Sequence, residues 1–173
     1  IKGPQLKPAL LAGMEANRAD LAAIAGRKDA ATFDNTIAAL EDAGRAFVRA
    51  NNVFSTFTSN LSDPAMQKVE QEMAPILAAF DDEITQNAPL FKRIKAVHDG
   101  REAAGLTPDQ KRLVEVHYRS FARRGAALGK PEKARLGAIN QRLATLFTTF
   151  GQNALADEEK HTLVLSSDKD LAG

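Results

Sequence analysis

Apolar residues recur at three- and four-residue intervals along most of the chain, and this spacing predicts helices. We expect a first helix from about Pro8 to Arg27, because proline suits the first turn of a helix. A second stretch opens at Thr32 with residues that cap helices and runs to Leu61, which predicts one long helix with a bundle-type seam. The predicted inward positions of these two helices are Leu10, Met14, Leu21, Ile24, Ile37, Leu40, Gly44, Phe47, Asn51, Phe54 and Leu61.

The third predicted helix begins at Asp63-Pro64, a capping residue followed by a first-turn proline. Pro75 lies inside its pattern and removes one intrahelical hydrogen bond, so we expect a kink near Gln71 to Ala74 rather than an end. The apolar positions of this helix are Met66, Val69, Met73, Ile76, Leu77, Phe80 and Ile84.

Three further helices complete the pattern. The fourth spans about Pro89 to Arg101, the fifth starts at a capping box of Thr107 and Gln110, and the sixth begins after Pro131. The sixth has the most regular apolar stripe in the chain. Their predicted inward residues are Leu90, Ile94 and Val97, then Leu113, Val116, His117 and Phe121, and last Leu136, Ile139, Leu143, Leu146, Phe147 and Phe150.

Beyond these helices, residues 161–165 form the one segment that favours a strand, and it is brief. The sequence therefore predicts an all-α fold, a bundle of about six helices with a short extended C-terminal tail, over residues 1–173. No fixed-period repeat, low-complexity tract or long linker divides the chain.

Composition excludes several functional classes. The 23 Lys and Arg residues nearly balance the 22 Asp and Glu residues, so no whole-molecule field would attract nucleic acid or anionic lipid. The lack of cysteine excludes a disulfide scaffold, a thiolate zinc site and a cysteine nucleophile. No apolar run approaches the ~20 residues that a membrane span needs. We expect a cytoplasmic location and leave the periplasm open, because the chain begins at Ile1 rather than at a methionine.

Three histidines are the candidate metal ligands and bases. The zinc-peptidase signature H-E-x-x-H places two imidazoles one helical turn apart, and no two of His98, His117 and His161 have that spacing. We expect His117 to be half-buried in a helix and the other two to be exposed. The sequence therefore presents no catalytic, cofactor-binding or metal-binding residue of this kind.

Other candidate chemistry has equally plain explanations. The neighbouring carboxylates Asp81-Asp82 and Glu158-Glu159 point about 100° apart on a helix, which predicts solvated helix faces rather than a converging pair. The glycines before Lys130 lack the spacing of a phosphate-binding loop. Few aromatic residues accompany the basic concentration, which favours salt bridging or solvated surface over nucleic-acid binding. Its members are Arg119, Arg123, Arg124, Lys130, Lys133 and Arg135.

Four stretches carry a resemblance that spacing alone does not supply. They are residues 31–41 (ATFDNTIAALE), 87–94 (NAPLFKRI), 118–126 (YRSFARRGA) and the segment 136–153 with LGAIN, LATL and FGQN. In residue identity, order and spacing they resemble motifs of the thimet oligopeptidase family of zinc metallopeptidases. Within that family they are most similar to the bacterial peptidyl-dipeptidases, and next to the oligopeptidase A branch.

The resemblance implies a larger enzyme with two largely helical halves around a deep channel, in which this chain forms part of one half. It implies a zinc ion held by an H-E-x-x-H helix further along the parent, short peptides as substrates, release of C-terminal dipeptides, and packing of this chain on the catalytic domain. No position here matches those functional residues, so we expect the chain by itself to be inactive and to hold no zinc.

Two alternatives stay open. The first is a stand-alone helical interaction module that has no catalytic partner. The second is a helical metal–carboxylate protein, which would need Glu-x-x-His pairs facing inward. Glu115 precedes His117 by two residues, and Glu158 precedes His161 by three in a segment that we expect to be a loop.

Overall fold

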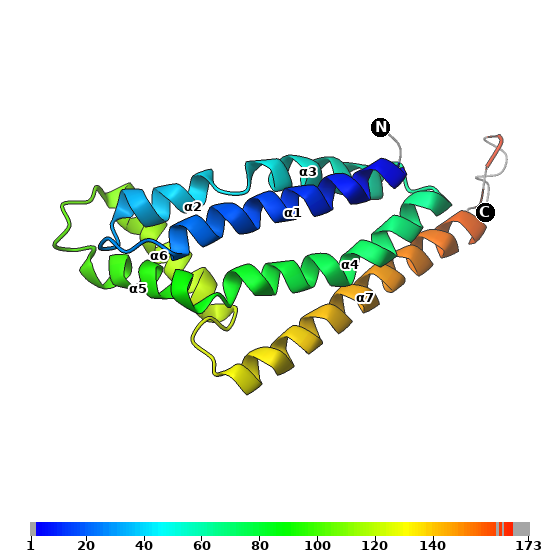
Figure 1. Cartoon of the computed structure of the whole chain (residues 1–173). Helices are drawn as coiled ribbons and strands as arrows, with labels where there is room; N and C mark the ends of the chain where they lie inside the picture. Colours follow the sequence, from blue (N-terminus) through cyan, green and yellow to red (C-terminus); the bar gives the residue numbers. More distant parts are fainter. Residues whose placement is uncertain (1–2, 162, 164, 168–173) are drawn as a thin grey trace.

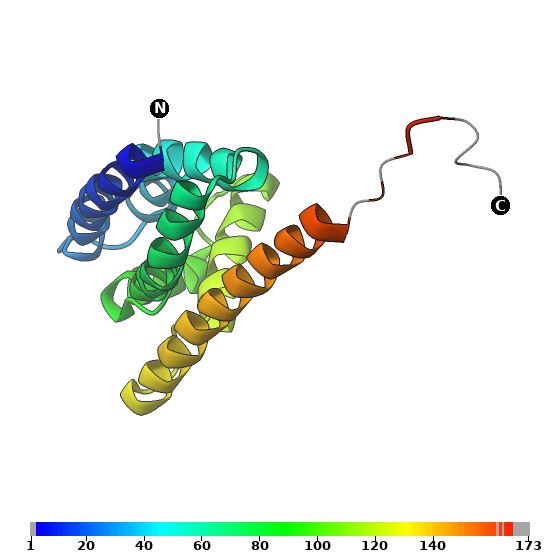
Figure 2. The same ribbon diagram turned by 90° about the vertical axis from the view of Figure 1, so that its right-hand side faces the viewer.

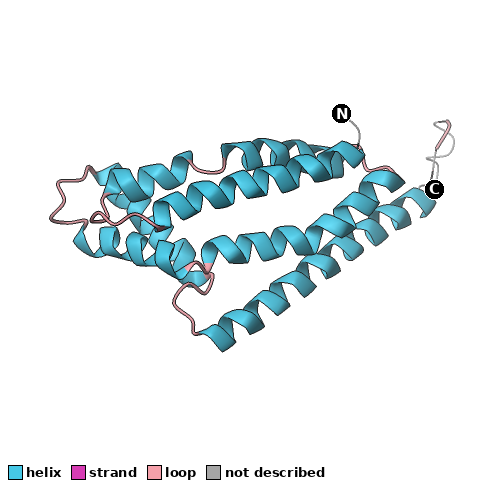
Figure 3. Cartoon of the chain, viewed as in Figure 1, coloured by secondary structure: helices cyan, strands magenta, loops and turns pink. Residues whose placement is uncertain are grey.

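Amphipathic stripes must be buried between elements, and this chain buries them between helices. The computed structural model describes residues 3–161, 163 and 165–167, and these residues contain no strand (Figure 3). The all-α prediction is confirmed. The elements are α1 (Gly3–Ala25), a π-helical segment η1 (Phe33–Ala38), α2 (Ala39–Asp42), α3 (Arg45–Asn60), α4 (Pro64–Thr85), α5 (Ala88–Gly100), α6 (Pro108–Arg123) and α7 (Lys130–His161).

Two hydrophobic clusters lie along α1 and form the core. The first cluster joins the end of α1 to η1, α5 and α6. Its buried members are Leu21, Ile24, Ile37, Leu90, Ile94, Val97, Val114, Phe121 and Ala126. The second cluster joins the start of α1 to α3 and α4. Its buried members are Leu6, Leu10, Met14, Phe54, Met66, Val69, Met73 and Phe80. Ile84 packs against both clusters, so the core is continuous along the bundle.

The first helix starts earlier than the sequence predicts, because Pro8 lies inside α1 rather than in its first turn. Leu6 is buried together with Leu10, so the apolar stripe extends upstream of the proline. Burying a leucine side chain contributes about 2 kcal/mol, whereas one backbone hydrogen bond contributes about 1 kcal/mol. The helix therefore continues through Pro8.

The predicted single helix from Thr32 to Leu61 is wrong, because the chain bends at Gly44 between α2 and α3. Gly44 has φ +68°, a left-handed conformation that suits glycine. Its amide donates to Asp20 Oδ2 at 3.0 Å, and a Cβ there would lie 2.7 Å from the Asn17 side chain. Gly44 is therefore the bend itself, and Leu61 at the end of α3 is exposed.

The third and fifth helices largely match their predictions. α4 runs unbroken through Pro75, and Figure 1 shows its axis changing direction partway along. The capping box before α6 is confirmed, with Gln110 N donating to Thr107 Oγ1 at 3.3 Å and Thr107 N donating to Gln110 Oε1 at 3.0 Å. One residue of that helix is wrongly placed: Val114 is buried and Val116 is exposed. Residues two positions apart on a helix point about 200° apart, so Val114 and Val116 cannot both face the core.

The last helix departs furthest from its prediction. α7 lies along α4 at the margin of the bundle (Figures 1 and 2), and none of its described residues belongs to either core cluster. Most of the stripe expected to face inward is exposed instead. Its exposed members are Ile139, Leu143, Leu146, Phe147 and Phe150.

The predicted strand at 161–165 is also corrected. His161 is the last residue of α7, and the described residues Leu163 and Leu165 are in no strand. Thr162 and Val164 lie outside the described residues. Within the described part of the chain, no helix is long and apolar enough to cross a bilayer.

Candidate functional site

Residues from three of the four stretches that carry the family resemblance converge on the first core cluster, and the fourth stretch lies on α7. Ile37 comes from the first stretch, Leu90 and Ile94 from the second, and Phe121 and Ala126 from the third, and all five are buried there. These side chains have no polar group to take part in a reaction. The three stretches therefore specify how η1, α5 and α6 pack.

A polar cluster between the same elements joins the loops to this core. Asn35 Oδ1 accepts hydrogen bonds from Thr32 N at 2.9 Å, from Thr36 Oγ1 at 2.8 Å and from Arg93 Nη2 at 2.8 Å. Arg93 is buried, and its Nη1 donates to the carbonyl of Asp29 at 2.9 Å. A buried guanidinium needs such acceptors to offset its lost hydration.

Sequence reasoning missed the role of Arg93. The signal was available, because position 93 is three residues after Leu90 and four before Val97, on the inward face of α5. A basic residue on an apolar face indicates a buried partner that the sequence does not identify. That partner, Asn35, lies 58 residues away.

The three histidines lie at separate places. The prediction that His98 is exposed is wrong: its ring stacks on Tyr118 with centroids 3.9 Å apart, and Nε2 lies 2.9 Å from Glu115 Oε2. His117 is half-buried as predicted, with Nε2 2.7 Å from Glu41 Oε1. The described His161 side chain is exposed, as predicted.

No metal-binding group is formed in the part of the chain that the structure describes. There, no cluster of three or more His, Cys, Asp or Glu side chains could hold a metal ion. The two candidate Glu–His pairs of the metal–carboxylate alternative do not face inward as pairs either. Glu115 pairs with His98, and His161 lies 3.0 Å from Asp157 Oδ1.

Glu115 is the centre of an ion-pair cluster between α5 and α6. The hydrogen bond with His98, together with the charges of Arg119 and Arg101, lowers the pKa of its carboxyl below the ordinary value of 4.5. Arg119 Nε lies 2.8 Å from Glu115 Oε1, and Arg124 Nη1 lies 2.7 Å from Asp81 Oδ1. The prediction of intramolecular salt bridging is therefore confirmed for these two members of the basic concentration.

The two neighbouring carboxylates of α4 diverge, as the helical spacing predicts. Asp81 faces Arg124, while Asp82 faces α7 and accepts from Asn140 Nδ2 at 2.7 Å. The expectation of a solvated face is wrong for Asp82, which is buried. Glu158 of the second pair is exposed, and the Glu159 side chain lies outside the described residues.

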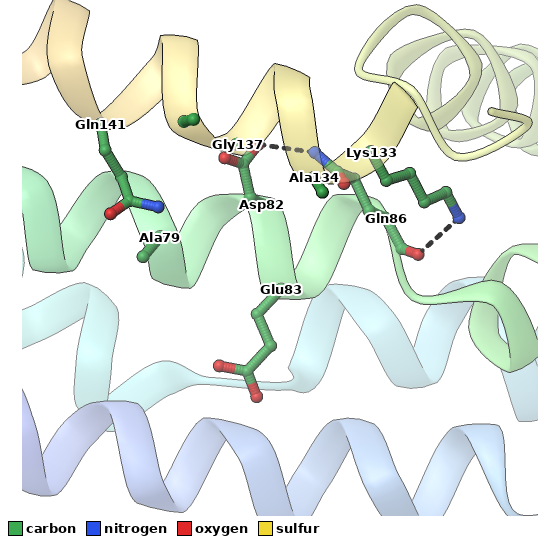
Figure 4. A pocket seen from close by; sticks show the side chains of 9 residues that line it. Ala79, Asp82, Glu83, Gln86, Lys133, Ala134, Gly137 and Gln141 are labelled. Carbon is green, nitrogen blue, oxygen red and sulfur yellow. Dashed lines mark hydrogen bonds between the residues drawn. The ribbon is translucent and has the colours of Figure 1, made fainter. Parts of the chain in front are cut away.

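Asp82 lies at a cleft of about 500 Å³ between α4 and α7 (Figure 4). Its lining residues are Ala79, Asp82, Glu83, Gln86, Lys133, Ala134, Gly137, Ala138 and Gln141. Asp82 Oδ1 also accepts from Gln86 Nε2 at 2.9 Å, and Lys133 Nζ donates to the Gln86 carbonyl at 2.9 Å. Asp82 Oδ2 is buried and has no hydrogen-bond partner among the described residues.

The polar groups of this cleft join two helices rather than face a substrate. Figure 4 shows Asp82 directed toward α7, whereas Glu83 points away and pairs with Arg18 Nη2 at 2.9 Å. None of the lining residues is a serine, threonine, cysteine or histidine, so the cleft is lined by no hydroxyl, thiol or imidazole group. The free Asp82 Oδ2 can accept a hydrogen bond from a donor seated there.

The fold and its polar contacts define an all-helical domain. The family model described as the N-terminal domain of neurolysin and thimet oligopeptidase matches residues 9–133. The chain therefore belongs to the neurolysin/thimet oligopeptidase family and contains its N-terminal domain.

Curated relatives agree with this family. The dipeptidyl carboxypeptidase of Escherichia coli (strain K12) is 36% identical over 167 residues, which are 96% of this chain and 24% of that protein. The dipeptidyl carboxypeptidase of Salmonella typhimurium is 34% identical over 173 residues, which are 100% of this chain and 25% of that protein. Oligopeptidase A of Haemophilus influenzae is 25% identical over 142 residues, which are 82% of this chain and 21% of that protein. The chain thus spans about a quarter of the length of the relatives it matches.

Proposed function

We propose that this chain is the N-terminal helical part of a zinc metallopeptidase of the peptidyl-dipeptidase type, which releases C-terminal dipeptides from short peptides. The supporting observation is that residues from three of the four stretches that resemble the family lie in the first core cluster, for example Ile37, Ile94 and Phe121. The two relatives with 36% and 34% identity bear the name dipeptidyl carboxypeptidase. The chain is similar to each of them over nearly all of its length, which supports the same place in a larger enzyme.

The zinc ion of the parent enzyme is proposed to bind outside this chain. In this class of reaction zinc activates a water molecule for attack on the peptide carbonyl. A catalytic zinc site needs three protein ligands around one point. The described side chains offer no such set, since His98 and His117 each pair with a separate glutamate. We place the zinc ligands in the part of the parent enzyme that this chain does not span.

The role left for the chain is to shape and position. We propose that it packs on the catalytic domain and forms one wall of a narrow substrate channel. A closed channel excludes folded proteins and aligns an extended peptide with the reacting centre. The full-length enzyme is then expected to cleave peptides of roughly a dozen residues or fewer and to spare native proteins. We also propose a cytoplasmic location, with the periplasm as the alternative; cell fractionation tests it.

Activity and metal content of two proteins test this proposal. The full-length protein should release C-terminal dipeptides from an unfolded peptide of about ten residues and hold zinc, because it contains both parts of the enzyme. The 173-residue chain should do neither. Dipeptide release is measured by mass spectrometry, and zinc by elemental analysis of dialysed protein. Turnover by the 173-residue chain, one tightly held zinc per chain, or rapid digestion of a native globular protein would contradict the proposal.

A stand-alone interaction module is the second candidate, and the exposed apolar face of α7 favours it as a surface for another protein. The two candidates differ in what the gene encodes. An H-E-x-x-H segment in the downstream reading frame supports the peptidase. A reading frame without such a segment supports the module.

A further inference from the structure

One face of α7 is apolar and uncovered. Phe147 is 71% exposed, Phe150 is 73% exposed and Leu146 is 52% exposed. Ile139 and Leu143 lie on the same stripe at 45% and 42% exposure. We call these five residues the α7 apolar face. Single exposed apolar residues are ordinary on a protein surface, but a contiguous stripe of large ones marks an interaction site.

The contacts of α7 with the rest of the chain explain why this face is free. Lys133, Asn140 and Gln152 bind α4, where Gln152 Nε2 donates to the Gln67 carbonyl at 3.1 Å and to Glu70 Oε2 at 2.8 Å. At 3.6 residues per turn, Asn140 lies about 75°, Lys133 about 95° and Gln152 about 165° around the helix from the centre of the α7 apolar face. The contacts with α4 therefore leave the centre of the apolar face uncovered.

The match to the N-terminal domain model stops short of most of α7, whereas a dipeptidyl carboxypeptidase matches the chain through α7 as well. The match to the N-terminal domain ends at residue 133, in the first turn of α7. Both core clusters are complete without any described residue of α7. The relatives are about four times as long as the matched segment, so most of their length lies outside it. α7 thus lies at the border between the N-terminal domain and a much larger remainder.

We infer that the α7 apolar face docks on the catalytic region of the full-length protein, with α7 as the first helix of that region. The inference rests on the proposed function and names the surface through which the two parts meet. A helix with five large apolar side chains gains most when they are buried against a partner of similar chemistry. With one side on α4 and its apolar face on the catalytic region, a single helix would connect the two parts.

Amide hydrogen exchange in the full-length protein and in the 173-residue chain tests this inference. Amides in residues 139–150 should exchange at least about tenfold more slowly in the full-length protein, because burial of one face stabilises the helix against local opening. The double variant Phe147→Gln and Phe150→Gln should remove most of that difference. It should leave the exchange of the 173-residue chain unchanged, because both side chains are exposed there. The matched control is Val48→Gln, an exposed apolar residue on α3, which should change neither protein.

Three results would overturn the inference. They are equal exchange of residues 139–150 in the two proteins, a difference that survives the double variant, and protection in the full-length protein that increases with protein concentration. The last result would identify a second copy as the occupant. The outcome is independent of the proposed activity, since a full-length protein with a protected α7 and no peptidase activity would refute only the proposed function.

Discussion

Arg93 connects segments that are far apart in the sequence. Its guanidinium reaches Asn35 and the carbonyls of Arg27 and Asp29, so it closes the loop between α1 and η1 against α5. A planar group with several donors can serve these acceptors together, which a lysine cannot do. The cost of burying its charge is offset only while all the acceptors are in place.

We expect Arg93→Met to lower the free energy of unfolding by about 3 kcal/mol, because the Asp29 carbonyl and Asn35 Oδ1 lose the hydrogen bonds that the guanidinium donates. Arg93→Lys should recover only part of the loss. The measurement is urea denaturation followed by circular dichroism. Lys92→Met, at an exposed neighbouring position, is the control and should change stability by less than about 0.5 kcal/mol. Equal effects at the two positions would contradict the assignment.

Gly44 permits the bend that sequence periodicity conceals. We expect Gly44→Ala to lower the free energy of unfolding by about 2 kcal/mol, because φ is +68° and a Cβ would lie 2.7 Å from Asn17 atoms. Gly151→Ala, in α7 with open space around it, should instead raise stability by about 0.5 kcal/mol. Guanidinium titration of both variants checks the opposite signs. A stabilising Gly44→Ala would mean that the bend is not required.

Arg93 and Gly44 have roles that could not be predicted from the sequence. The capping box of Thr107 and Gln110 could be predicted, because all its atoms lie within four residues. Gly44 fits the helical period as well as any seam residue, and its conformation follows from Asn17 and Asp20 on another helix. Arg93 likewise depends on an acceptor 58 residues away.

α5 and α6 are joined on the outside of the bundle by Glu115, whose carboxyl has a lowered pKa. As the pH falls, the unfolded chain protonates this group first, near 4.5, and the folded chain protonates it at a lower pH. Its contribution to stability is therefore fully present above 4.5. That contribution is lost as the pH falls through the lower, folded-state pKa.

We expect Glu115→Gln to lower stability at pH 7 and to make stability depend less on pH below 4.5. Thermal melts between pH 3 and pH 7 test this. Glu102→Gln is the comparison, because Lys111 also lowers the pKa of that carboxyl. The Glu102 side chain is 70% exposed, so solvent screening should make its effect smaller. An unchanged acid limb in Glu115→Gln would contradict the role of this cluster.

Helix α7 has the most regular apolar stripe in the sequence, and the prediction that this stripe faces inward is wrong. Periodicity correctly predicts that Leu143, Leu146 and Phe150 share one face. It does not say what that face contacts, because the partner is a property of the assembled fold. The side of α7 that faces α4 combines half-buried small and apolar residues, Gly137, Ala144 and Leu155, with the polar contacts of Asn140 and Gln152.

The assembled bundle is built around two core clusters that need no residue of α7. We therefore expect a chain that ends at Gly129 to keep a cooperative thermal transition at a lower Tm, since both core clusters remain while the packing of α7 on α4 is lost. Circular dichroism melts of this chain and of the 173-residue chain make the comparison. A non-cooperative melt of the shorter chain would show that α7 is part of the domain's core.

The sequence by itself determined the all-α class, most helix positions, the caps and the family, because these depend on spacing within a few residues and on short sequence motifs. Tertiary structure alone decided the bend at Gly44, the burial of Arg93 and Asp82, and the outward direction of the α7 apolar face. Each of these depends on groups that are distant in the sequence. Local periodicity reports which side chains share a face, and only packing decides whether that face is covered.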